Sequence, residues 1–183
     1  MPIDAAAEFR IIVADSIPES ADPRIFRFLD AWRGARHGRL LPRKRDFEPL
    51  DVADLLGCVW LYRYDGEAGD FICRLAGEAV NDAWGGSIRG LTLRRIVGEA
   101  DYPVMIGRWR RIVSTPLIHY GADSERLSGL SARRAERLLM PMTDDEGEAV
   151  FMLGLSLYRI ESADATRPVL TPEDMIQVPC ERI

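Results

Sequence analysis

The sequence has few of the residues that catalysis and metal binding use most often. It contains 2 histidines, His37 and His119, and 3 cysteines, Cys58, Cys73 and Cys180. The cysteines show neither CxxC spacing nor an even disulfide framework, so we expect reduced thiols. The histidines lack the spacing of a metal site or a catalytic triad. The pattern therefore supports neither a metal centre nor a nucleophilic active site.

Long apolar runs and an excess of positive charge are also absent. No stretch approaches the roughly 20 apolar residues that cross a bilayer, and the apolar run over residues 9–14 is too short for a secretory signal and is interrupted by Arg10. The formal net charge is −5, which argues against general attachment to nucleic acid or to an anionic membrane. We expect a soluble cytoplasmic protein with no nucleic-acid or membrane partner.

The apolar content is sufficient for one domain with a sizeable core. The chain has 183 residues, of which 47% are hydrophobic. We divide it into an N-terminal extension with a helix over residues 1–37, a domain over residues 38–162, and a polar, proline-punctuated tail over residues 163–183.

A helix is predicted to begin at Asp22 and Pro23, because Asp caps the first turn and Pro fits the first helical position. Apolar residues then follow helical spacing: Ile25, Phe28, Leu29 and Trp32. The predicted domain does not obviously need this stripe to close its core, so we expect an exposed interface of a homodimer, with Trp32 as its anchor.

Two hairpins are predicted on either side of two helices. Residues 58–64 and 71–76 form the first hairpin, and in ordinary register Trp60 and Tyr62 share a face with Ile72 and Arg74. Because Arg74 is a charge in an apolar strand, we expect it to have an ion-pair partner or to bind an anion.

The helices are expected over residues 77–84 and from Asp101 to the residues before Pro116, with a short strand over residues 117–120. Residues 133–142 and 149–160 form the second hairpin around an acidic turn. Both of its faces are apolar, with Leu138, Met140, Leu153 and Leu155 on one and Leu139, Met152 and Tyr158 on the other. Such a sheet needs a second cover, supplied by the N-terminal helix or by another subunit.

Two short motifs indicate a family: Arg74-Leu75-x-Gly77, and Leu139-x-Pro141 in the second hairpin. With the fold-forming residues around them, residues 38–160 resemble a family of short bacterial PAS-type proteins. The resemblance implies an α+β fold, a five-stranded antiparallel sheet with helices on one face, to which this chain adds its N-terminal helix. It implies signal sensing, small-ligand binding or protein pairing, and no reaction. The family usually has Thr after the glycine, where this chain has Glu78.

Aromatic walls and adaptable methionines are suited to a small apolar ligand, with polar anchors beside them. The candidate ligand-binding residues are Tyr62, Arg74, Trp84, Tyr102, Trp109, His119, Met140 and Met152. No cofactor is indicated, and the partner is either a small molecule or a signalling protein. We also consider a ligand-free interaction or dimerisation module, indicated by a closed core, and a small cone-shaped α+β enzyme, indicated by a deep pocket with a converging His/Asp or Tyr/Asp pair.

Overall fold

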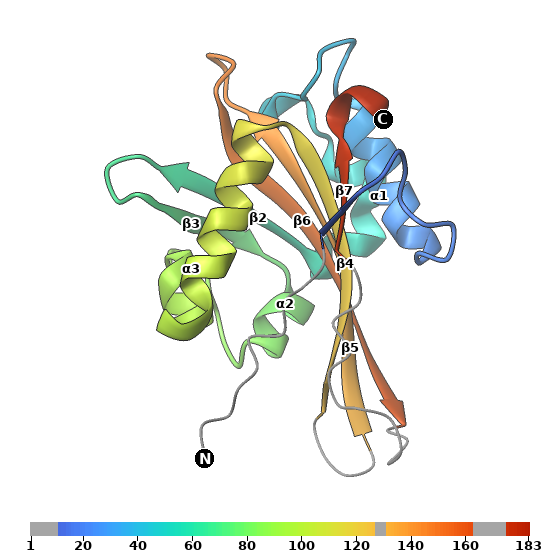
Figure 1. The fold of residues 1–183 in the computed structure, drawn as a ribbon, viewed down its shortest axis with the longest axis vertical. Coiled ribbons are helices and arrows are strands. Elements are labelled where there is room, and N and C mark those ends of the chain that lie inside the picture. The colour runs from blue at the N-terminus through green and yellow to red at the C-terminus, as the bar shows by residue number, and fades with distance from the viewer. Residues whose placement is uncertain (1–10, 127–130, 163–174) are drawn as a thin grey trace.

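The computed structural model describes residues 11–126, 131–162 and 175–183 and shows one sheet with helices on both faces (Figure 1). The strands lie in the order β1-β7-β4-β5-β6-β2-β3. Their bounds are β1 (Ile11–Val13), β2 (Val59–Asp65), β3 (Asp70–Ala76), β4 (Leu117–Arg126), β5 (Ser131–Thr143), β6 (Ala149–Ser162) and β7 (Met175–Pro179). All neighbours are antiparallel except β1 and β7, which pair in parallel.

The mixed α+β class is confirmed, but the sheet has seven strands and not the predicted five. Strands β2 to β6 make an antiparallel sheet of five. The C-terminal residues 175–179, assigned to a polar tail, extend it as β7 beside β4, and residues 11–13 of the N-terminal extension pair with β7. The tail prediction is wrong there because Val178 and Cys180 are fully buried. Residues 1–10 of the extension and 163–174 of the tail lie outside the described residues.

Helix α1 (Pro23–Gly34) begins where the capping signal predicts, and it covers one face of the sheet. The side chain of Asp22 accepts a hydrogen bond from the backbone N–H of Arg24. The four residues of the apolar stripe are buried in the chain's own core, and Trp32 donates a hydrogen bond from Nε1 to the carbonyl oxygen of Pro141 at 3.0 Å. The prediction that Ile25, Phe28, Leu29 and Trp32 form an exposed interface is therefore wrong. These four side chains cover the apolar face of β4, β5 and β6 on which α1 packs, and burial of that face stabilises the fold.

A buried carboxylate fixes the start of α1 to the sheet. Glu136 on β5 accepts hydrogen bonds from the backbone N–H of Asp22 at 2.7 Å and from the hydroxyl of Tyr120 at 3.0 Å. Asp22 in turn pairs with Arg24 and Arg159, and the hydrogen bonds from Arg24 hold the pKa of the Asp22 carboxyl well below its usual range. This network ties the helix to β4, β5 and β6.

The opposite face of the sheet lies under α2 (Glu78–Ala83) and α3 (Leu93–Ser114) (Figure 1). The shorter predicted helix is confirmed. The longer one begins eight residues before Asp101, at Leu93, and bends at Gly98, whose φ of 80° ends the first helical segment. Three 3₁₀ helices complete the described part: η1 (Lys44–Asp46), η2 (Pro49–Cys58) and η3 (Cys180–Arg182).

The first hairpin forms as predicted but in a different register. Tyr62 pairs with Cys73, whereas the neighbouring Leu61 pairs with Leu75. Arg74 is therefore the extra residue of a β-bulge, and its side chain is exposed. The prediction that Arg74 shares a face with Trp60 and Tyr62 is wrong. Tyr62 pairs directly with Cys73, which puts Phe71 and Cys73 on the face of Tyr62 and leaves Arg74 exposed on the other face of the outermost strand.

Steric crowding explains why the Arg-Leu-x-Gly motif ends in glycine, at Gly77. A Cβ atom at Gly77 would lie 2.3 Å from the carbonyl oxygens of Leu56 and Gly57, so the backbone of η2 passes too close for a side chain. The backbone N–H of Gly77 also donates to the carbonyl oxygen of Val59 at 2.8 Å. The motif thus marks the contact between η2 and the end of β3.

The second hairpin has the predicted pairing of faces. Leu138, Met140, Leu153 and Leu155 pack in the core under α1, whereas Leu139, Met152 and Tyr158 pack under α3. The chain's own helices thus cover both faces of this hairpin. The second cover that the sequence requires comes from the N-terminal helix α1 and not from another subunit.

Candidate functional site

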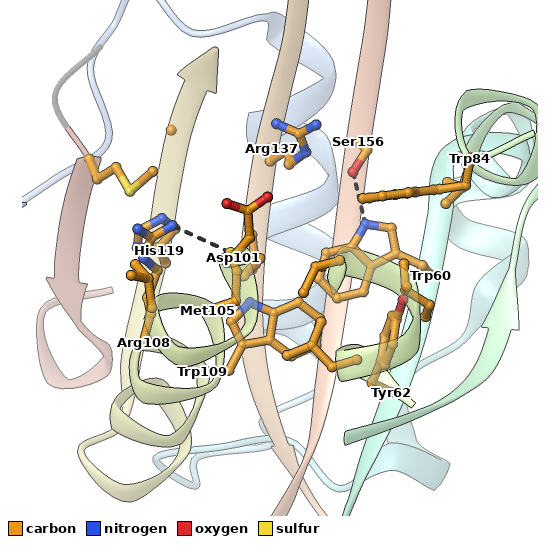
Figure 2. Close-up of a pocket in the computed structure, with 18 of the residues that line it drawn as sticks. Trp60, Tyr62, Trp84, Asp101, Met105, Arg108, Trp109, His119, Arg137 and Ser156 are labelled. Atoms are coloured by element: carbon orange, nitrogen blue, oxygen red, sulfur yellow. Dashed lines mark hydrogen bonds between the residues drawn. The ribbon is translucent and has the colours of Figure 1, made fainter. Parts of the chain in front are cut away.

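A cavity of about 520 Å³ lies between α3 and the face of the sheet that α2 and α3 cover (Figure 2). This volume is within the range typical of small-molecule sites. Side chains from the central strands, from both segments of α3, from α2 and from β7 line it. The labelled lining residues in Figure 2 are Trp60, Tyr62, Trp84, Asp101, Met105, Arg108, Trp109, His119, Arg137 and Ser156.

The β2 side of the cavity is aromatic. Trp60 and Trp109 stack in parallel, with ring centroids 5.3 Å apart and an interplanar angle of 2°, and Tyr62 meets each of them edge-on. Trp60 donates a hydrogen bond from Nε1 to the hydroxyl of Ser156 at 2.9 Å, which fixes the plane of its ring. Trp84 is 47% exposed and lies at the mouth of the cavity. These rings offer flat apolar surfaces.

The β4 side carries buried polar atoms without protein partners. His119 is 3% exposed and its Nδ1 has no hydrogen-bond partner within the described chain, and the same holds for Nε1 of Trp109. Gln177 on β7, directly opposite His119 in the ladder, is fully buried and its side-chain amide also lacks a partner among the described residues. Buried polar groups are normally paired, so these atoms are exceptions, but they are covered by neighbouring atoms and do not face the open space of the cavity, and Gln177 is not among its lining residues.

Burial and the nearby Arg108 lower the pKa of His119 to about 3, so its imidazole is neutral at neutral pH. Two half-buried guanidinium groups line the cavity, those of Arg108 and Arg137, and Arg137 lies over the ring of Tyr158 at 5.9 Å. One carboxylate, that of the exposed Asp101, is at the rim. The described lining therefore carries more positive than negative charge, opposite in sign to the whole chain.

A family model described as PAS domain matches residues 21–157 of the chain. The chain belongs to the PAS-domain family. A search of curated proteins gave no match. The matched region of this PAS domain includes the helices α1, α2 and α3, the strands β2 to β5 and most of β6, whereas β1 and β7 lie outside it.

The PAS domain brings together four of the eight predicted ligand-binding residues. Tyr62, Trp84, Trp109 and His119 line the cavity. Tyr102 and Met152 are buried in the core beneath α3 but are not among the lining residues. Met140 faces α1 on the opposite side of the sheet, and Arg74 is exposed on the outer strand β3, so neither belongs to the cavity. Met140 directly follows the lining residue Leu139, and alternation along β5 places the two side chains on opposite faces of the sheet.

Most of the lining residues were not predicted, among them Trp60, Arg108, Arg137, Ser156, Tyr158 and Met175. A usable signal existed for Met175. The short run Met-Ile-Gln-Val before Pro179 has two β-branched residues, Ile176 and Val178, two positions apart, as a strand with one buried face does, and it follows Pro172. The arginines had no such signal, since charges on helices and strands are usually solvated.

Within the ranges that the structure describes, no group of three or more His, Cys, Asp or Glu residues has the arrangement of a metal site. No helix there is long and apolar enough to cross a membrane.

Proposed function

We propose that this PAS domain binds a small organic molecule in the cavity between α3 and the sheet and acts as a sensor or regulator through that binding. The family indicates a sensory or regulatory role in general. The observation that carries the proposal is the cavity of about 520 Å³ between α3 and the sheet, a volume typical of small-molecule sites, with the side chains of Trp60, Trp109 and His119 in its lining.

The two alternatives have less support. A ligand-free interaction module agrees with a core filled by its own side chains, and this domain has a cavity in its place. An enzyme would use His119 or Tyr158 with Asp101, which line the same cavity. The imidazole of His119, with a pKa near 3, is a weak general base at neutral pH, so we propose a binding role and not a catalytic one.

The homodimer and the signalling partner stay predictions. The four stripe residues of α1 have no exposed apolar surface to offer a second copy, because Ile25, Phe28 and Trp32 are fully buried and Leu29 is nearly so. Any homodimer therefore uses another surface. A cytoplasmic location is likewise part of the proposal.

Native mass spectrometry of gently purified protein tests ligand binding and oligomeric state together. We expect a mass increment from a non-covalently bound small molecule. Gly121→Val is the blocking variant, because Gly121 lines the cavity and a Cβ there would meet Met175 at 3.6 Å and His119 at 3.8 Å, so a larger side chain extends into the free space. Gly66→Val, in the exposed turn between β2 and β3 with no atom within 4 Å of its Cβ, is the matched control.

Loss of the increment in Gly121→Val and its retention in Gly66→Val would support the site. A parent protein that shows no increment, and no thermal shift with any member of a metabolite library, would contradict the proposed function.

A further inference from the structure

Helix α3 contributes mostly aliphatic and thioether side chains to the cavity. Among them are Ile96, Val97, Val104 and Met105, and Met175 on β7 adds a second methionine to the lining. Methionine has three rotatable bonds and a polarisable sulfur, so its side chain adapts to the outline of a bound molecule. These walls favour an apolar ligand and do not require a particular ring geometry.

The aromatic residues deep in the lining are occupied with one another. Trp60 stacks on Trp109, Tyr62 meets both edge-on, and each of the three is 5% exposed or less. Their ring faces are therefore covered by the protein's own side chains. Trp84 and Val104 also line the cavity but are 47% and 58% exposed, so they form an apolar rim through which a chain can reach solvent.

The charged side chains of the lining disfavour ligands of either charge. Arg108 and Arg137 both already interact with other groups of the protein, and Arg108 also donates a hydrogen bond from Nη1 to Sδ of Met105 at 3.9 Å (Figure 2). Neither offers an uncompensated charge to an anion, yet both repel a cation. At the rim, the exposed carboxylate of Asp101 repels an anion that enters.

The uncharged polar groups of the lining are paired or covered in the same way. The hydroxyl of Ser156 accepts a hydrogen bond from Nε1 of Trp60 at 2.9 Å, and Tyr158 has a partner within the protein. Nδ1 of His119 is buried under neighbouring atoms. A charged or strongly polar ligand would therefore give up its hydrogen bonds to water without equivalent replacements, which is unfavourable.

We propose that the ligand is an uncharged molecule with a flexible aliphatic chain, which lies against Met105 and Met175 and reaches solvent beside Trp84, and that Asp101 at the rim disfavours anionic ligands. This inference rests on the proposed function, because it names the chemical class that the same cavity binds.

Isothermal titration calorimetry with three probes of equal chain length, 1-octanol, octanoate and octylammonium, tests the class. We expect octanol to bind at least about 10-fold more tightly than either ion, because each ion leaves water without gaining a partner. Shortening the chain to 1-hexanol should weaken binding by about 15-fold, since each buried CH₂ group contributes roughly 4-fold.

Asp101→Asn separates repulsion at the rim from the cost of burying a charge. The variant should bind octanoate about 2- to 5-fold more tightly and octanol with unchanged affinity, because the carboxylate acts only on the ion. Glu67→Gln removes the same charge from the exposed turn between β2 and β3, which is not part of the lining, and is the matched control. An octanoate affinity that is the same in Asp101→Asn and in the parent would contradict the role of Asp101.

The methionine methyl groups report where the probe lies. In NMR spectra of protein with labelled methionine methyl groups, assigned with Met→Leu variants, the signals of Met105 and Met175 should shift when octanol is added. Met140 packs under α1 on the opposite face of the sheet, so its signal should stay in place and is the internal control.

Equal or tighter binding of octanoate or octylammonium, no binding of octanol, or a shift of Met140 in place of Met105 and Met175 would overturn the uncharged aliphatic class. The proposed function would stand in those cases if native mass spectrometry still shows a bound small molecule that Gly121→Val excludes.

Discussion

The indole of Trp60 lies directly over Gly154 of the neighbouring strand β6. A Cβ atom at residue 154 would lie 2.0 Å from Cζ2 of Trp60 and 2.1 Å from its Cε2. The two residues are paired across β2 and β6. The absence of a side chain at position 154 is thus what allows Trp60 to lie flat against the sheet and to stack on Trp109.

We therefore expect Gly154→Ala to displace Trp60 and to lower the free energy of unfolding by about 1–3 kcal/mol, as overpacked cores do. Urea denaturation followed by tryptophan fluorescence measures this change. Gly121→Ala is the control, because its added Cβ would have ordinary contacts of 3.6 Å and 3.8 Å, and it should change stability by about 0.5 kcal/mol or less. Similar stabilities for the two variants would contradict the steric argument.

Replacing Phe28 and Trp32 together by Ala should prevent folding or destabilise it severely. Each side chain is fully buried between α1 and the sheet, and removal of a buried large aromatic costs about 3–5 kcal/mol. Circular dichroism and size-exclusion chromatography should show loss of the native fold. A folded double mutant whose only change is its oligomeric state would restore the interface interpretation of this helix.

Arg74→Ala should leave stability unchanged within about 0.5 kcal/mol, because Arg74 is an exposed residue of a β-bulge on the outer strand β3. Thermal unfolding monitored by circular dichroism measures the effect. Glu136→Ala is the informative contrast, because it leaves the N–H of Asp22 and the hydroxyl of Tyr120 without their acceptor, and it should cost about 1–3 kcal/mol. A loss of that size in Arg74→Ala would show that the exposed guanidinium has a structural partner.

Stability should fall as the pH is lowered from 7.5 to 5, because His119 is buried in its neutral form. Folding lowers its pKa from an ordinary value near 6.5 to about 3, so below pH 6.5 the unfolded chain binds the proton first and acid favours unfolding. The free energy of unfolding is independent of His119 well above pH 6.5. Below pH 6.5 it decreases by up to about 1.4 kcal/mol per pH unit, so the loss at pH 5 is about 2 kcal/mol.

Chemical denaturation at the two pH values measures this difference. His119→Gln should remove it, whereas His37→Asn, a change at the exposed histidine, should retain it. If His119→Gln does not fold, the ring C–H signals of His119 in NMR spectra of the parent report its pKa directly. A value near 6.5 would contradict the prediction.

The sequence by itself determined the elements whose evidence is local. Alternation assigned Leu138 and Leu139 to opposite faces of β5, and the Asp22-Pro23 signal placed the start of α1. These predictions hold because the two-residue period of a strand and the cap of a helix depend only on neighbouring residues.

The tertiary structure decided what depends on residues distant in the chain. The register that leaves Arg74 exposed is set by the pairing of Tyr62 with Cys73 on another strand, and no single-strand pattern encodes it. The burial of Trp32 depends on β5 and β6, and its hydrogen-bond partner Pro141 follows it by 109 residues. Met175 reaches the cavity only because β7 pairs with β4. An apolar stripe specifies that it must be covered, whereas the surface that covers it is set by how the whole sheet assembles.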